Sequence, residues 1–419
     1  MSDNASSTTG NTGAITGMTG GTRPRQPELG AGVVILMAVA AGLCVASIYY
    51  NQPMLGILAK SFQAGPGEVS LIPIVTQVGY AAGLLLLSPL GDRYERRGLI
   101  VWTTAALTLA LAAAALAPSI ALLAAASLAV GVLATVAQQV VPMAAQLAPD
   151  NQKGRVVGLV MAGLLTGILL SRTVSGVVSE YGSWRLMFGL ASVSTAALAA
   201  LLAVRLPRVE PLIKVSYPGL LLSLVGLLRQ HATLRRAGLV QGLLFAGFVS
   251  FWSSLAFFLE QPPFRMGSSV AGALGVVGIV GVMVAPLAGR FADKGGKRRI
   301  ILLGAASVAA SFALFWLGRE SMAVLIAGIV LMDAGLQAAM ISNQAQVFGL
   351  DASARSRLNT VFMTIMFTGG AIGTALGAQA YSLFGWAGVC GFGAGCSLAG
   401  FAIQFLSPAT PSAQTAQAD

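Results

Sequence analysis

The chain has 419 residues, of which 56% are hydrophobic and only 9% are charged, and its mean hydropathy is +0.80. A soluble globular domain carries about 25% charged residues, so this composition excludes an ordinary soluble protein. The 25 Lys and Arg residues outnumber the 14 Asp and Glu residues and give a formal net charge of +11. Such a basic excess suggests nucleic-acid binding in a soluble protein, but the high hydropathy argues against that function and predicts a polytopic membrane protein.

The first 29 residues, rich in Ser, Thr and Gly, are expected to form a disordered cytoplasmic tail and contain no apolar core of a signal peptide. A bilayer requires about 20 apolar residues for each spanning helix, and twelve such segments follow. We predict them at 30–50, 69–90, 99–116, 120–145, 156–178, 186–204, 238–259, 268–288, 300–317, 322–347, 358–380 and 387–406. The expected fold class is therefore an all-α membrane protein with twelve transmembrane helices.

The basic residues support this topology. With both termini in the cytoplasm, 20 of the 25 Lys and Arg residues lie on the cytoplasmic side and four lie outside. Cytoplasmic loops of membrane proteins carry this kind of positive excess. We therefore predict a multi-pass protein of a bacterial-type inner (plasma) membrane, in which the net charge indicates orientation and not a nucleic-acid surface.

A polar interval divides the spans into two bundles of six helices. The N-terminal bundle covers 30–205, the central cytoplasmic loop 206–237 and the C-terminal bundle 238–406, and 407–419 is expected to be a disordered tail. Inside the loop, the apolar run 220–228 is followed by Arg229, Arg235 and Arg236. This run could lie flat on the anionic cytoplasmic leaflet, or the loop could be a solvated tether between the bundles.

The two bundles repeat one another at a spacing of 201 to 202 residues. The repeat is carried by an acidic residue after the second span of each half and by small residues at every fourth position of the fifth span. These residues are Asp92 and Asp293, then Gly167, Ser171 and Ser175, and then Gly369, Gly373 and Gly377. Small residues at this spacing let helices approach closely in lipid, and two parallel six-helix repeats are the plan of many secondary transporters.

The loop after the second span, SPLGDRYERR, resembles the signature loop of the major facilitator superfamily, G-x-L-A-D-R-x-G-R-R, and the resemblance covers residues 30–406. Ser88 and Glu95 replace the two glycines of that pattern, and a second copy begins at Gly289. The matching residues are Asp92, Arg93, Arg96 and Arg97, and then Gly289, Ala292, Asp293, Gly296 and Arg298. The resemblance implies that these loops dock against the opposite half as a cytoplasmic gate, and the alternative is that their arginines only set the topology.

The fifth span resembles a motif of the exporters of this superfamily, G-x8-G-x3-G-P-x2-G-G, and Ser171 and Arg172 replace its internal Gly-Pro pair. The matching glycines, for which we expect a role in helix packing, are Gly158, Gly167 and Gly176. The end of the first span, IYYNQPML, is similar to a motif of the drug:proton antiporter branch and its sugar-efflux-like relatives. That branch usually carries an arginine in the fourth span where this chain has Ser127, so the resemblance alone does not imply proton antiport.

Two ionisable residues lie far from either membrane surface, Arg172 in the fifth span and Asp333 in the tenth. A charge at the centre of a spanning helix costs about 2.5–3.5 kcal/mol on insertion scales, so such residues usually face a cavity and have a function. The alternative is a buried structural ion pair. An Arg172 partner would keep Asp333 ionised, whereas an isolated Asp333 could take up and release protons. Our hypothesis is that a proton binds Asp333 as cargo leaves Arg172.

Several polar or aromatic side chains within the spans are expected to line a substrate and proton pathway. They are Asn51, Gln52, Gln139, Gln241, Gln337, Gln344 and Trp252. Other helices can also satisfy polar amides inside hydrocarbon, so hydrogen bonding between helices is the alternative. Trp252, with Phe245 and Phe248, could stack an apolar cargo or only pack. Glu260 is a candidate for an outer gate.

The sequence predicts no enzyme, cofactor or metal site. His231 is the one histidine, three cysteines lie in apolar runs, and no phosphate-binding loop for ATP occurs. The expected function is a secondary active transporter that exports a small molecule by alternating access through proton antiport. We expect a monomer in the lipid bilayer, with a small-molecule substrate and protons as partners and no nucleic acid. The alternatives are a proton-coupled importer or an uncoupled facilitator and, from a different class, a membrane-embedded enzyme.

Overall fold

The computed structural model describes residues 30–149, 151–209, 216–279, 296–351 and 354–407. Within these ranges the regular elements are helices, nine of which are long and apolar enough to cross a membrane. One of the nine, α17 (Arg355–Leu406), loses helical geometry at Gly385 and so contains both of the last two predicted spans. Two shorter apolar helices belong to the first and eighth spans, and the eighth span lies outside the described residues from position 280 onward. The expected all-α membrane fold is confirmed.

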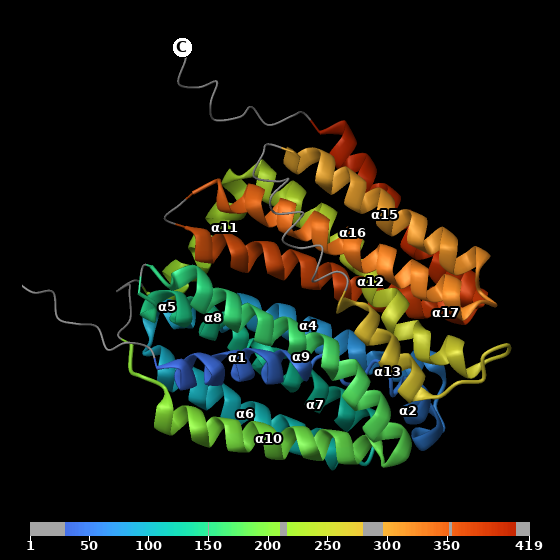
Figure 1. Ribbon diagram of the computed structural model, residues 1–419, viewed down its shortest axis with the longest axis horizontal. Coiled ribbons are helices and arrows are strands. Elements are labelled where there is room, and N and C mark those ends of the chain that lie inside the picture. The colour runs from blue at the N-terminus through green and yellow to red at the C-terminus, as the bar shows by residue number, and fades with distance from the viewer. Residues whose placement is uncertain (1–29, 150, 210–215, 280–295, 352–353, 408–419) are drawn as a thin grey trace, which may run out of the picture.

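The helices form two bundles that lie side by side (Figure 1). The N-terminal bundle contains α1 (Ala31–Ala46), α2 (Leu55–Phe62), α3 (Pro66–Val69), α4 (Leu71–Leu86), α5 (Leu90–Arg93), α6 (Arg96–Ala115), α7 (Ile120–Leu133), η1 (Ala134–Val136), α8 (Ala137–Leu147), α9 (Lys153–Tyr181) and α10 (Trp184–Arg205). The C-terminal bundle contains α12 (Ala232–Glu260), α13 (Ser268–Val277), α15 (Lys297–Leu317), α16 (Met322–Phe348) and α17. We call the end where α9, α12 and α15 begin the basic end, on the left in Figure 1, and the opposite end the far end.

Several helices begin where the local sequence supplies a cap. Ser119 precedes α7 and Ser183 precedes α10, and their hydroxyls accept hydrogen bonds from the backbone N–H groups of Leu122 at 3.4 Å and Leu186 at 3.0 Å. Serine is a preferred residue at this position because it satisfies a free N–H of the first turn. Glu95, which replaces a glycine of the signature loop, accepts two such bonds at the start of α6, at 3.0 and 2.8 Å. The departure from the family pattern therefore provides a cap for α6.

The fifth span of each half crosses the first span at a pair of glycines. A Cβ atom on Gly167 of α9 would lie 2.2 Å from the carbonyl oxygen of Gly42 in α1. A Cβ atom on Gly369 of α17 would lie 2.5 Å from the carbonyl oxygen of Gly242 in α12. Real Cβ atoms essentially never approach other atoms within 3.0 Å, so these crossings require glycine. The repeat in the sequence is therefore a repeat of helix packing.

The other glycines of the exporter-like motif do not share this crossing. Nine residues are about two and a half turns of an α-helix, so Gly158 and Gly176 lie on the face of α9 opposite Gly167. Gly176 approaches α13 of the other bundle, where its Cβ would lie 2.4 Å from the carbonyl oxygen of Ser268. Gly158 is exposed, and a Cβ there would meet nothing within 4 Å. Gly158, expected to pack against a helix, therefore makes no such contact in this structure.

The remaining small residues of the repeat differ between the two halves. In α17, Cβ atoms on Gly373 and Gly377 would collide with Ala246 and Ser250 of α12, which extends the close crossing along the helix. In α9, Ser171 instead donates from its hydroxyl to the carbonyl oxygen of Ile168 in its own helix, at 2.6 Å. The crossing between α12 and α17 is therefore the longer of the two glycine-lined contacts.

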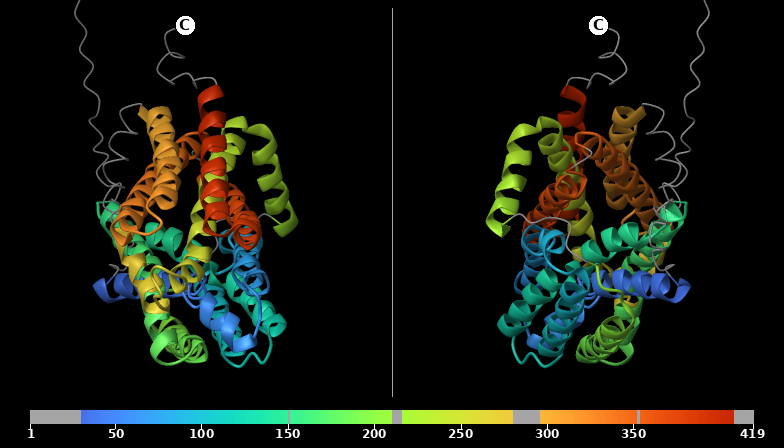
Figure 2. Two further views of the ribbon diagram at one scale, coloured as in Figure 1. Left: turned by 90° about the vertical axis from the view of Figure 1, so that its right-hand side faces the viewer. Right: turned by 90° about the vertical axis from the view of Figure 1, so that its left-hand side faces the viewer.

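The apolar run 220–228 forms most of a further helix, α11 (Tyr217–Gln230), at the edge of the bundles (Figure 2). Leu224 and Leu227 are buried in a cluster with Leu358 and other residues of the C-terminal bundle. At its start, the Tyr217 hydroxyl donates to the carbonyl oxygen of Leu86 in the N-terminal bundle, at 2.9 Å. The central segment is thus helical over this run and contacts both bundles, and α12 already begins at Ala232. Contact of α11 with the membrane surface stays a prediction.

Candidate functional site

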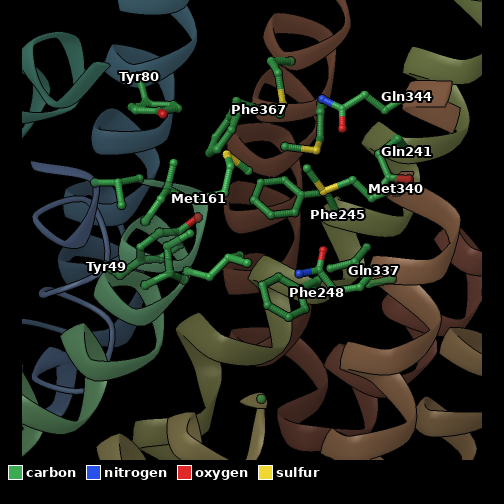
Figure 3. Close-up of a pocket in the computed structure, with 18 of the residues that line it drawn as sticks. Tyr49, Tyr80, Met161, Gln241, Phe245, Phe248, Gln337, Met340, Gln344 and Phe367 are labelled. Carbon is green, nitrogen blue, oxygen red and sulfur yellow. The ribbon is translucent and has the colours of Figure 1, made fainter. Parts of the chain in front are cut away.

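A cavity of about 440 Å³ lies between the two bundles. Figure 3 shows Tyr49, Tyr80 and Met161 of the N-terminal bundle facing Phe245 and Phe248 of the C-terminal bundle across it. Its wall combines aromatic rings, methionine side chains and a few amides with two charged residues, Arg172 and Asp333. Ligand pockets typically have such a wall, with much apolar surface and few polar groups.

Arg172 of α9 is held by an amide and by aromatic rings. The side chain is 3% exposed, and its Nε donates to Gln52 Oε1 at 2.8 Å. Its guanidinium carbon lies 4.4 Å from the ring centroid of Trp252 and 4.7 Å from that of Tyr49, with the Phe248 ring at 5.8 Å. Aromatic faces attract a cation, most strongly where water is excluded. These contacts fix the guanidinium in place, and no carboxylate of the described residues lies within 4.0 Å of it.

Asp333 of α16 lines the same cavity from the other bundle and is buried. Among the described residues, no ion pair within 4.0 Å joins it to Arg172, and its Oδ2 atom has no hydrogen-bond partner. The two residues that the sequence identifies are therefore brought to one cavity, on opposite bundles, without pairing. Their opposite charges still act on one another, because a cavity inside protein screens charge less than water does.

The break after α1 supplies the partner of Arg172. The helix ends at Ala46, and the chain passes through turns before α2 begins at Leu55. Pro53 cannot donate a backbone hydrogen bond and disfavours helical geometry in the residue before it, which is Gln52. The neighbouring Asn51 instead bonds α4, where its Nδ2 donates to the Thr76 hydroxyl at 3.0 Å. Of these two candidates, Gln52 bonds Arg172 and Asn51 joins helices.

The amides of the C-terminal bundle line the cavity as the sequence predicts. Gln337, Gln344 and Gln241 all lie in its wall. Gln344 Nε2 donates to Asn359 Oδ1 at 2.8 Å, and Gln241 Oε1 accepts from Asn343 Nδ2 at 3.2 Å. Polar lining and bonding between helices, which were alternative predictions, therefore occur together in these side chains.

Gln139 lies elsewhere. Its Nε2 donates to the carbonyl oxygens of Leu87 at 2.8 Å and Ser88 at 3.0 Å, at the end of α4, and Gln138 takes a place in the cavity wall. The tighter 3-10 turn η1 interrupts the helix just before this pair. A turn of 3.0 residues shifts the faces of everything after it, so a regular helix drawn through this point assigns the wrong face to Gln139.

Aromatic residues outside the predicted set complete the site. Tyr49 lies against Arg172, and Tyr80 of α4 packs on Phe367 of α17 with ring centroids 4.4 Å apart, so that this pair joins the bundles. Both tyrosines belong to apolar spans in which a hydroxyl is unexpected, and that is the signal by which a sequence could have identified them.

The signature-loop residues at the basic end bond within their own bundle. Arg96 donates to Asp92 Oδ1 at 2.9 Å and to the carbonyl oxygen of Gly91 at 2.8 Å, Arg97 donates to the carbonyl of Ala203, and Arg93 lies beside Tyr94. In the second copy, Gly296 precedes α15 and Arg298 donates to the carbonyl oxygen of Phe405 at 2.7 Å, whereas Gly289 and Asp293 lie outside the described residues. A gate formed by docking against the opposite half stays a prediction.

Further bonds join the two bundles at the far end. Lys60 Nζ lies 3.1 Å from Glu260 Oε2, and the Glu180 carboxylate accepts from the backbone N–H of Ser269 at 2.6 Å in the first turn of α13. Thr173 donates to the carbonyl oxygen of Gly272 at 3.0 Å nearer the middle of α9. The residues that line the cavity run from Arg172 toward the basic end, where they include Phe348 at the end of α16 and Asn359 near the start of α17.

Comparison with known proteins agrees with this architecture. The family model of the Major Facilitator Superfamily matches residues 37–350. The chain is 39% identical over 377 residues to the uncharacterized transporter YgaY of Escherichia coli O157:H7. This alignment covers 90% of this chain and 95% of that protein. It is 26% identical over 303 residues, 70% of each chain, to a chloramphenicol efflux pump of Mycobacterium tuberculosis (strain CDC 1551 / Oshkosh).

Among solved structures, the nucleoside transporter NupG has a similar fold. The TM-score is 0.72 at 12% sequence identity, over 89% of this chain and 99% of that chain. Two bundles related by a repeat, a cavity between them and the match of the family model all lead to one conclusion: this chain is a membrane transporter that belongs to the major facilitator superfamily.

Proposed function

We propose that this transporter exports a small molecule by alternating access in exchange for protons, in a bacterial inner membrane with both termini cytoplasmic and as a monomer. The observation that carries the proposal is that Arg172 and Asp333 share one cavity without forming an ion pair. Buried charges without a direct partner are costly inside a membrane and usually mark a transport pathway.

Proton exchange follows if cargo and proton compete for the Asp333 carboxylate. Cargo that donates a hydrogen bond to Asp333, or forms an ion pair with it through a positive charge, requires the ionised carboxylate. A proton on the carboxylate removes that interaction. The charged groups nearest this exchange are Asp333 and Arg172, with Tyr49 stacked on the guanidinium. Because cargo and proton cannot occupy Asp333 together, the transporter carries cargo in one direction and a proton in the other. Each ligand shifts the equilibrium between the inward-open and outward-open states only by its difference in affinity for the two states.

Export is favoured by two observations. The cavity extends toward the basic end, which the positive-inside rule places in the cytoplasm, so this state would receive cargo from inside the cell. In addition, a relative at 26% identity is named a chloramphenicol efflux pump, and the aromatic wall around Phe245 and Phe248 suits an apolar cargo of that general kind.

A proton-coupled importer is the second candidate, and the chemistry of the same site supports it. An anionic cargo on Arg172 would favour a neutral Asp333 beside it, so proton and cargo would bind together and move in one direction. Ser127, buried in α7 where the antiporter branch carries an arginine, is consistent with this alternative or with an uncoupled facilitator. The charge of the cargo therefore decides between exchange and co-transport.

The test is a compound-toxicity panel in cells that overproduce the protein, with Asp333→Asn and Arg172→Ala as variants and Glu320→Gln, at an exposed site, as the matched control. We expect resistance to at least one compound, its loss in both cavity variants and its retention in the control. Heightened sensitivity in the overproducing cells would support import. Resistance that persists in Asp333→Asn and still collapses with the proton gradient would contradict the proposed role of Asp333.

A further inference from the structure

Three buried hydrogen-bond donors around Arg172 have no acceptor. They are Arg172 Nη2, Trp252 Nε1 and Gln52 Nε2, and none of them has a partner among the described residues. They form one group, because Gln52 already bonds the guanidinium through its Oε1 and the Trp252 ring lies against it at 4.4 Å. Buried donors are nearly always paired in folded proteins, so a cluster of unpaired donors indicates an acceptor that comes with a ligand.

The chemistry of this cluster specifies an anion. All three unpaired atoms are donors, and one belongs to a guanidinium that carries a full positive charge and has no carboxylate partner. A carboxylate offers two oxygen atoms with about four acceptor positions, and bonds from a guanidinium to a carboxylate are among the strongest in proteins. The rings of Tyr49, Phe248 and Trp252 lie around the cation and also line the cavity, so an apolar or aromatic group next to the acid would contact them.

Asp333, elsewhere in the cavity wall, has an unpaired hydrogen-bond acceptor. Asp333 Oδ2 is a buried acceptor with no partner among the described residues, and it carries negative charge when ionised. Arg172 is not the partner of this oxygen, because the two side chains form no ion pair. Arg172 of the N-terminal bundle and Trp252 and Asp333 of the C-terminal bundle all line the cavity, which therefore combines unpaired donors around Arg172 with an unpaired acceptor on Asp333.

We propose that the cargo is a zwitterion with an apolar, aromatic body, whose oxyanion is held by Arg172 and Trp252 and whose ammonium is held by Asp333. This inference rests on the proposed function, because it specifies the class of cargo for the same cavity. A zwitterion brings no net charge into the low-dielectric cavity, and it satisfies the donors and the acceptor together. Its ammonium competes with the proton for Asp333, which makes a zwitterion compatible with exchange where a simple anion is not.

Binding of three fluorescent probes with one aromatic group tests the class of cargo directly. Nε-dansyl-lysine carries both charges, dansylcadaverine carries only the ammonium, and 6-(dansylamino)hexanoic acid carries only the carboxylate. Each is titrated into the purified full-length protein in lipid nanodiscs with no proton gradient. Because a hydrogen bond to a charged group contributes about a tenfold change in affinity, we expect the zwitterion to bind at least about tenfold more tightly than either single-charge probe.

Variants assign each charge to its wall. Arg172→Gln is expected to weaken the zwitterion to the level of dansylcadaverine, and Asp333→Asn to weaken it to the level of the carboxylate probe. Trp252→Phe keeps an aromatic ring at this position but removes the N–H donor together with the five-membered part of the indole, so dansylcadaverine, which has the same aromatic group and no carboxylate, measures the effect of the lost ring area. The substitution should weaken the two carboxylate probes severalfold and leave dansylcadaverine unchanged. The matched control is Trp316→Phe, at a partly exposed ring outside the cavity, which should alter none of the three.

Equal affinities for the three probes, no binding of any probe, or a Trp252→Phe effect that is the same for dansylcadaverine would overturn the inference. The proposed function can fail separately. If the zwitterion is preferred and the variants behave as expected, but no proton gradient drives its transport in proteoliposomes, the class of cargo stands and the exchange mechanism falls. If export is found but no probe preference appears, the reverse holds.

Discussion

Replacing Gly167 by alanine is the most direct test of how the first and fifth helices pack. The new Cβ would lie 2.2 Å from the carbonyl oxygen of Gly42, whereas ordinary van der Waals contact begins at 3.4 Å. The difference of 1.2 Å must be met by separating α1 from α9, since the three atoms nearest to the new Cβ are all backbone atoms of Gly42. Overpacking of this kind costs about 1–3 kcal/mol.

Gly158→Ala is the matched control for this substitution. It changes the same residue type in the same helix, at a position where a Cβ meets nothing within 4 Å. Replacing glycine by alanine in a helix contributes up to about 1 kcal/mol of stability, and this gain is shared by both variants. The difference between the two therefore isolates the collision at the crossing.

The measurement is thermal unfolding of the purified protein in detergent, followed by tryptophan fluorescence. We expect the unfolding midpoint of Gly167→Ala to fall below that of the wild type and the midpoint of Gly158→Ala to equal or exceed it. Gly369→Ala, at the corresponding crossing of the other half, should behave like Gly167→Ala. Equal midpoints for Gly158→Ala and Gly167→Ala would refute the argument that these helices require glycine at their crossing.

Three further predictions concern single contacts. Glu260→Gln should lower stability by less than about 1 kcal/mol, because the Lys60 side chain of the ion pair is 73% exposed and is screened by water. Unfolding midpoints at low and high salt should differ less in this variant than in the wild type, and an unchanged salt response would argue against the pair. Gly385→Ala should cost about 1–3 kcal/mol, because its φ of 61° and ψ of −147° are backbone angles that essentially only glycine adopts. Gly391→Ala, in equally open space with ordinary φ, should not be destabilising in the same thermal assay. Gln139→Leu should lower the free energy of unfolding by about 1–3 kcal/mol, because the carbonyl groups of Leu87 and Ser88 lose their donor. Binding of dansyl-lysine should stay unchanged, and a selective loss of binding would mean that Gln139 contributes to the cavity.

The sequence locates the spans well because their signal is local. A run of about 20 apolar residues spans the bilayer wherever it occurs, and the predicted span 322–347 differs from α16, Met322–Phe348, by a single residue. The repeat that relates Gly167 to Gly369 also survives in three dimensions, because equivalent helices of the two halves pack in equivalent ways. Errors enter where the helix itself is irregular, as at η1, after which Gln138 and not Gln139 lines the cavity.

What the sequence by itself determined is therefore the membrane class, the division into two bundles and the exceptional status of Arg172 and Asp333, because hydropathy and charge act residue by residue. Only the tertiary structure decided how those two residues are surrounded. Gln52 reaches Arg172 from 120 positions away, and Asp333 approaches the same cavity from the other bundle without pairing. Contacts of this range depend on how whole helices are placed against one another, which no local pattern records.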